Sequence, residues 1–124
     1  MIQQFIELGN GYGDVYELLT LIDTNETRFH QAFIFKADEK VSLAVAFKPA
    51  LDSKFMPIYI CREGIPFNEA KPSKRTQLFI DAVHKLQRKP VTIEVKKSTD
   101  FNETSLYYQY LIGILRMHHY IPHL

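Results

Sequence analysis

Cysteine and long apolar runs are both scarce in this 124-residue sequence. The single cysteine, Cys61, cannot form a disulfide within the chain, and it lies in an apolar run, 57–61, which favours a buried and inert thiol. This predicts a reducing, cytoplasmic compartment. The start of the chain, Met1–Glu7, has no basic region ahead of an apolar run, so we expect no secretory signal. The longest apolar stretch, 106–115, is far shorter than the roughly 20 residues of a membrane span, so we expect no membrane partner.

An excess of charge of one sign is also lacking, because the formal net charge is only +1. The distribution is uneven, however: segment 71–97 holds eight basic and two acidic residues, whereas the first seventy residues hold six basic and ten acidic ones. A basic face of this kind can contact nucleic-acid phosphates. Exposed helix faces and helix ends also collect lysines for solubility alone. The candidate nucleic-acid-binding residues are Lys71, Lys74, Arg75, Arg88, Lys89 and Lys96.

Familiar catalytic patterns are missing or poorly placed. The glycines of 9–13 match neither the dinucleotide fingerprint nor the nucleoside-triphosphate loop, so they indicate a turn. Glu94 and Lys96 have the acid-x-lysine spacing of metal-dependent nucleases, but a solvated strand face is the preferred interpretation. The histidines of 118–123 include two adjacent ones, whose side chains point about 100° apart on a helix, which does not favour a metal site. We therefore predict no catalytic residue, no metal and no cofactor, and we leave enzymatic activity uncertain while favouring a non-enzyme.

The pattern of apolar residues predicts strands at 2–8, 28–36, 41–48, 57–61 and 90–97. A helix from Ser73 to about Arg88 is predicted, with Ser73 as its cap. Segment 14–22 fits a helix, which we prefer, although Asn10-Gly11 between two apolar runs is also typical of a hairpin.

The last predicted helix begins with a capping box formed by Asp100 and Glu103. Its predicted core stripe contains Leu106, Tyr110, Leu111, Ile114, Leu115 and His118. Opposite this stripe Tyr108 and Ile112 flank Gly113, and a helix that is apolar almost all round is buried on two sides. We therefore predict a homodimer interface at Tyr108, Ile112 and Gly113. The alternative is that the N-terminal strand or the Pro122 tail covers this side.

These elements predict one domain over residues 1–124. Strands cluster early and helices late, which favours the α+β class: a single, mostly antiparallel sheet of about five strands with two or three helices packed on it. A restriction-endonuclease-like core without the catalytic residues is the alternative, because the order helix, three strands, helix, strand is the same.

Two stretches carry a resemblance to a known family. Phe5-Ile6-Glu7-Leu8-Gly9-x-Gly11-Tyr12-x-Asp14-x-Tyr16-Glu17-Leu18 and 59–66, Tyr-Ile-Cys-Arg-Glu-Gly-Ile-Pro, resemble a small family of uncharacterised bacillus-type proteins, some of which are labelled methylthioribose kinase. The resemblance implies a cytoplasmic bacterial protein without a known activity. The kinase label does not transfer, because the chain is too short for a kinase domain and lacks a glycine loop with its lysine and an Asp-Phe-Gly.

The function predicted from the sequence is a non-catalytic regulatory or adaptor domain that forms a homodimer and binds an unknown protein partner. The first alternative is nucleic-acid binding through segment 71–97. The second alternative is an enzyme whose site is assembled from loops.

Overall fold

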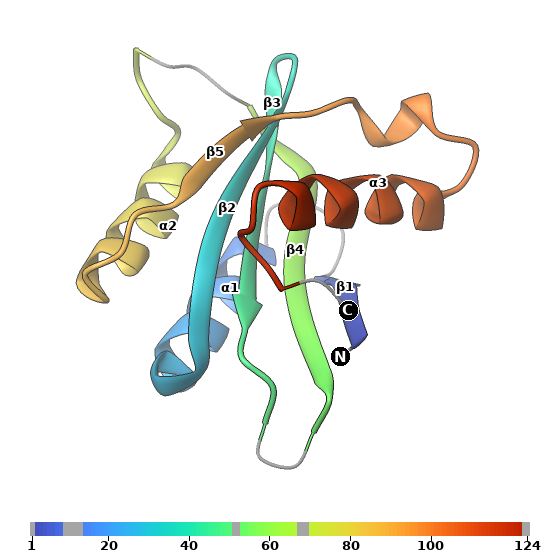
Figure 1. Ribbon diagram of the computed structural model, residues 1–124. Helices are drawn as coiled ribbons and strands as arrows, with labels where there is room; N and C mark the ends of the chain where they lie inside the picture. The colour runs from blue at the N-terminus through green and yellow to red at the C-terminus, as the bar shows by residue number, and fades with distance from the viewer. Residues whose placement is uncertain (1, 9–13, 51–52, 67–69, 123–124) are drawn as a thin grey trace.

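The computed structural model describes residues 2–8, 14–50, 53–66 and 70–122 (Figure 1). Every strand predicted from the sequence is present, and segment 14–22 is helical. The predicted turn at 9–13 and His123 lie outside the described residues. The elements are β1 Ile2–Glu7, α1 Asp14–Thr24, a 3₁₀ turn η1 Glu26–Arg28, β2 Phe29–Ala37, β3 Lys40–Phe47, β4 Phe55–Pro66, α2 Lys74–Lys85, β5 Val91–Glu94, a 3₁₀ turn η2 Ser98–Asp100 and α3 Thr104–Met117.

The described strands form one five-stranded sheet in the order β1-β4-β3-β2-β5. The architecture is α+β, as predicted, but the sheet is mixed rather than mostly antiparallel. The β2–β3 and β3–β4 pairings are antiparallel, whereas β1 pairs with β4 and β2 pairs with β5 in parallel. The reason is that consecutive strands joined by short turns must run antiparallel, while a strand that returns after a helix can pair in parallel. The alternative prediction, a restriction-endonuclease-like core, requires the order helix, three strands, helix, strand. This order is present as α1, β2 to β4, α2 and β5, and β5 lies beside β2 in the sheet.

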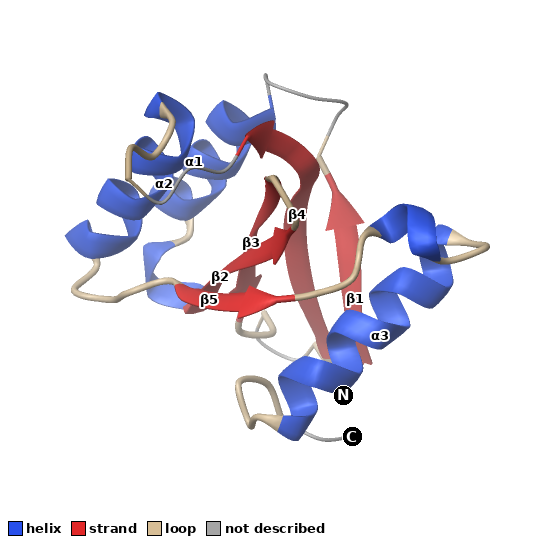
Figure 2. Cartoon of the chain, turned by 90° about the horizontal axis from the view of Figure 1, so that it is seen from above, coloured by secondary structure: helices blue, strands red, loops and turns tan. Residues whose placement is uncertain are grey.

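Helices cover both faces of the sheet (Figure 2): α1 and α2 pack on one face, and α3 packs on the other. The central strands are therefore buried on both sides. In β3, Leu43 and Val45 face α1 and α2, whereas the small side chains of Ala44 and Ala46 face α3. Phe33 pairs directly with Ala44 across the sheet, so a large side chain lies opposite a small one and the α3 layer can pack closely.

A bulge changes the face of the sheet on which Phe29 is buried. Strict alternation along the predicted strand 28–36 would place Phe29, Phe33 and Phe35 on the same side of the sheet. The β2–β3 register shifts between Phe29 and Gln31, and Phe29 consequently packs with the α1 and α2 side while Phe33 and Phe35 pack with α3. One extra residue in a strand reverses the direction of the side chains beyond it, which explains the difference.

The helix ends agree with the sequence at α2 and disagree at α3. The Ser73 hydroxyl accepts a hydrogen bond from the Thr76 backbone amide at 3.3 Å, as the predicted cap requires. The predicted capping box at Asp100 and Glu103 is wrong, because Asp100 belongs to η2 and α3 begins at Thr104.

The end of the described chain is fastened to the sheet on the α3 side. The Gln3 side-chain nitrogen donates to the Pro122 carbonyl at 2.6 Å, and the Gln3 side-chain oxygen accepts from Arg116 Nε at 2.7 Å. His30 Nε2 lies 2.8 Å from the Tyr120 carbonyl oxygen. Segment 118–122 is thereby held against β1 and β2. No helix in the described part of the chain is long and apolar enough to cross a bilayer.

Candidate functional site

A polar cluster joins α3 to the sheet. The Tyr108 hydroxyl donates to the Glu7 carboxylate, and Arg62 Nε lies 3.1 Å from the same carboxylate oxygen. Arg62 Nη1 also donates to the Thr104 hydroxyl at 3.1 Å. The Tyr108 ring stacks on Phe5, with 4.9 Å between ring centroids. The cluster therefore connects β1, β4 and α3 through side chains that are far apart in the sequence.

The electrostatics of this cluster favour a structural role. Burial raises the pKa of Tyr108 above its usual value, and the hydrogen bond to the Glu7 carboxylate raises this pKa further. The phenol consequently remains a hydrogen-bond donor at neutral pH. A tyrosine used as a base or nucleophile needs the opposite change, a lowered pKa. The arrangement thus acts as a clamp between α3 and β1.

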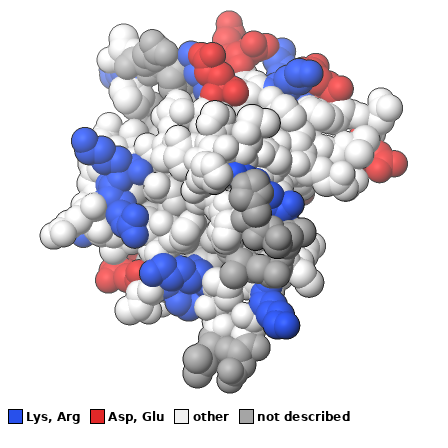
Figure 3. All heavy atoms as spheres, in the orientation of Figure 1, with Lys and Arg blue, Asp and Glu red and all other residues white. Residues whose placement is uncertain are grey.

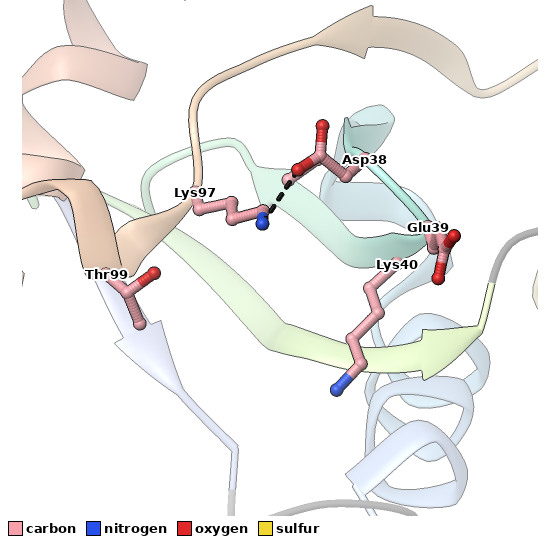
Figure 4. Close-up of a pocket in the computed structure, with 6 residues that line it drawn as sticks. Asp38, Glu39, Lys40, Lys97 and Thr99 are labelled. Carbon is pink, nitrogen blue, oxygen red and sulfur yellow. Dashed lines mark ion pairs between the residues drawn. The ribbon is translucent and has the colours of Figure 1, made fainter.

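A charged hollow of about 750 Å³ lies beside the β2–β3 turn and is lined by residues 37–40, Lys97 and Thr99 (Figure 4). Lys97 Nζ points at the Asp38 carboxylate, 2.8 Å away, whereas the Glu39 and Lys40 side chains point away from this pair. The Asp38 and Lys97 side chains are 69% and 50% exposed, so the ion pair contributes at most about 1 kcal/mol. Because the opposite charges neutralise one another, the hollow has no net charge that selects a ligand.

The acid-x-lysine pair, Glu94 and Lys96, also lies near this end of the sheet. Glu94 lies directly across the sheet from Lys36, and its carboxylate is 3.7 Å from Lys36 Nζ. The Lys96 backbone amide donates to the Tyr110 hydroxyl at 3.2 Å. Glu94 therefore takes part in a cross-strand ion pair on the surface of the sheet.

The predicted nucleic-acid-binding residues fall into separate groups. Lys74 and Arg75 begin α2, and Lys71 precedes it. Arg88 and Lys89 follow the end of this 12-residue helix, about 18 Å away along its axis. Lys96 lies beyond the end of β5. In Figure 3 basic side chains gather over the end of α2 and the start of β2, while acidic ones gather near the β2–β3 turn and the segment after β5.

The three predicted interface residues lie on two different sides of α3. Tyr108 contacts Phe5 and Glu7, and Ile112 is half-buried against the same core cluster. Gly113 is exposed, and a Cβ atom added to it would meet no atom within 4 Å. The β1 strand thus covers the Tyr108 side, as the alternative to the dimer prediction proposed, and Gly113 alone of the three lies on the outer surface.

The outer face of α3 is a stripe that we call the α3 face, formed by Leu106, Gln109, Gly113 and Met117. Leu106 is 42% exposed and Met117 is 72% exposed. The prediction of Leu106 and His118 as core residues is therefore wrong, because both are exposed, and the buried stripe consists of Tyr107, Leu111 and Leu115. Leu106, Gln109 and Met117 were not predicted as surface candidates from the sequence. Of the four residues of the α3 face, only Gly113 was named as a candidate from the sequence.

Cys61 and the histidines near the end of α3 are the remaining candidates for chemistry. Cys61 is 2% exposed and packs in the core beside α1 and α2, as predicted. The rings of His118 and Tyr120 lie 6.0 Å apart. Within the described ranges, histidine, cysteine and carboxylate side chains do not gather in groups of three that could hold a metal ion.

Comparison with known proteins identifies a family. A family model described as a domain of unknown function (DUF7147) matches residues 1–121. No curated protein and no solved structure matches the chain.

Proposed function

The chain belongs to the DUF7147 family of domains of unknown function, and we propose that it is a non-catalytic adaptor that works as a homodimer joined along the α3 face. The observation that carries this proposal is Gly113, exposed in the interior of α3. The single buried cysteine and the resemblance to bacillus-type proteins support a bacterial cytoplasm as its location.

Glycine at position 113 lowers the stability of α3, and no contact of the described residues explains why a glycine is there. Glycine in the interior of an exposed helix is about 1 kcal/mol less favourable than alanine. The backbone at Gly113 is ordinary helix, and a Cβ atom there would have free space. Among the described residues, neither a turn nor a close contact therefore requires glycine. Close approach of a second helix would require it.

The rest of the α3 face is suited to contact with a second copy. Equivalent residues meet around the two-fold axis of a dimer. If two α3 helices cross antiparallel at Gly113, Met117 of one copy lies beside Gln109 of the other, because both are four residues from the crossing point. This contact would bury the most exposed large apolar side chain of the helix, Met117. The apolar surface removed from water would favour association.

The test is the mass of the protein in solution, measured by light scattering for the wild type and for Gly113→Leu. We expect a wild-type dimer whose mass does not change with salt, because the contact is apolar. Gly113→Leu should be a folded monomer, since the leucine side chain meets nothing within its own chain but prevents the helices from crossing closely. A matched control is Ser105→Leu, which adds the same side chain at an exposed position beside the stripe.

Two results would overturn the proposal: a monomeric wild type, or a Gly113→Leu variant that keeps the dimer mass. A mixed pool of short DNA and RNA is added in parallel at low and high salt. A gain in mass with nucleic acid that disappears at high salt would instead support the alternative function, through Arg88, Lys89 and the other predicted basic residues.

A further inference from the structure

Residues of α1 and α2 line a groove. These two helices lie on the face of the sheet opposite α3 (Figure 2). The volume of the groove is about 550 Å³, within the range of ligand-binding clefts. Apolar side chains from the two helices line it: Tyr16, Leu19, Ile22, Leu78, Ala82 and Leu86. Tyr16 is 51% exposed, so the groove has a large ring at its surface. The groove thus presents an apolar floor to the outside.

Acidic side chains border this floor. Asp23, Glu26 and Asp81 line the groove with a single basic residue, Lys85. Asp81 accepts a hydrogen bond from the Gln77 side chain at 2.8 Å. Within the described part of the chain, none of the three carboxylates forms an ion pair with a lysine or arginine. Their charge is therefore available to a cationic group on a partner.

The groove continues into a basic hollow at one end. The hollow has a volume of about 340 Å³ and is lined by Glu26, Thr27, Phe29, Lys48, Leu86 and Arg88. Glu26 and Leu86 line both the groove and the hollow, so the two form one continuous surface. The Arg88 guanidinium lies over the Phe29 ring at 5.8 Å from its centroid, which holds this positive charge at the rim.

From this polarity we propose that the surface binds an amphipathic helical segment of a partner protein. The apolar face of the segment lies on the groove floor, its basic residues lie beside Asp23 and Asp81, and its acidic end lies in the hollow at Lys48 and Arg88. A helix in an apolar groove is a common mode of peptide recognition. Charge complementarity at both ends fixes the direction in which the helix binds.

This inference rests on the proposed adaptor function and specifies the class of partner. The groove lies on one face of the sheet and the α3 face lies on the other, so each can be tested without disturbing the other. The α1–α2 groove should be unchanged in the Gly113→Leu variant. If this variant still binds the selected peptides, the docking site is supported whether or not the wild type is a dimer. If the wild type is a dimer but binds no peptide, only the docking site fails.

The experiment is selection from a phage-displayed library of random 16-residue peptides on the purified full-length protein. We remove the clones that also bind the Ala82→Arg variant. Ala82 is half-buried on α2 and lines the groove, so an arginine at this position fills the groove. We expect selected peptides to share apolar residues three or four positions apart, basic residues next to them, and carboxylates at one end. Affinities of the synthetic peptides are then measured by fluorescence polarisation.

Charge variants test the direction of binding. Asp81→Lys and Arg88→Glu should each weaken the selected peptides by about tenfold. A peptide without its acidic end should bind Arg88→Glu and wild type equally, while it remains sensitive to Asp81→Lys. Glu17→Lys is the matched control, because Glu17 is an exposed acidic residue of α1 that does not line the groove, and it should have no effect.

The proposal would be refuted if no peptide distinguishes wild type from Ala82→Arg. It would also be refuted if the selected peptides bind the two charge variants as tightly as wild type. Asp81 and Arg88 are exposed, so we expect Asp81→Lys and Arg88→Glu to fold normally. These two variants therefore test the proposal even if Ala82→Arg is unstable.

Discussion

The Tyr108 clamp gives the sharpest quantitative prediction. Tyr108→Phe keeps the ring that stacks on Phe5 and removes only the hydroxyl that donates to Glu7. Hydrogen bonds to charged groups contribute about 1.5–3 kcal/mol when buried. The Glu7 side chain is 41% exposed and keeps its contact with Arg62, so we expect a loss below this range, about 1 kcal/mol, from the free energy of unfolding.

The same substitution should change the response of stability to alkaline pH. The pKa of Tyr108 is raised in the folded protein, so between pH 10 and the folded pKa the folded state keeps a proton that the unfolded state loses. The contribution of Tyr108 to stability is complete below about pH 10 and falls as the pH rises above it. Tyr108→Phe has no hydroxyl to titrate, so its free energy of unfolding should fall less steeply above pH 10 than that of the wild type.

Urea unfolding at pH 7, 9 and 10.5, followed by circular dichroism, measures both effects. Tyr16→Phe is the control, because it removes a phenol from a half-exposed ring on α1. A double-mutant cycle with Glu7→Gln isolates the coupling of the two side chains. Equal alkaline slopes for wild type and Tyr108→Phe, together with a coupling energy near zero, would refute the clamp.

Two further predictions concern packing and capping. Leu111→Ala should lower the free energy of unfolding by about 3 kcal/mol, because Leu111 is fully buried between α3 and the sheet. Leu106→Ala should lower it by well under 1 kcal/mol, because Leu106 is exposed. Similar losses for the two variants would contradict the assignment of the buried face of α3. Ser73→Ala should cost about 1 kcal/mol, because its hydroxyl caps α2 through the Thr76 amide, and retention of that stability in urea unfolding would contradict the cap.

Local patterns explain why much of the fold could be predicted. The strand predicted at 41–48 is present as β3, and its alternating residues Val41, Leu43, Val45 and Phe47 pack in one core cluster. The helix predicted from Ser73 to about Arg88 is present as α2, Lys74–Lys85, with Ser73 as its cap. In each case the residues that decide the structure are neighbours in the sequence, so their spacing contains the information.

Pairing between distant segments could not be read in this way. Nothing near β1 in the sequence specifies that it pairs with β4 in parallel, since that choice depends on the path of the intervening chain. The face of α3 was misjudged because apolar residues surround most of the helix, and only the surface of the sheet selects Tyr107, Leu111 and Leu115 for burial. The Glu7–Arg62–Tyr108 cluster likewise joins three elements that no motif connects.

The division of helices between the two faces of the sheet gives the two proposals a common logic. A dimer joined along the α3 face places the sheets between its interface and the two α1–α2 grooves, so both grooves remain open and point away from the two-fold axis. A partner that carries two copies of the recognised segment can then occupy both grooves, and the second binding event becomes intramolecular. Modest affinity at each groove would suffice for tight binding, provided that the linker between the segments spans the dimer. If both proposals hold, dimerisation would therefore strengthen the binding of such a partner beyond what one α1–α2 groove provides.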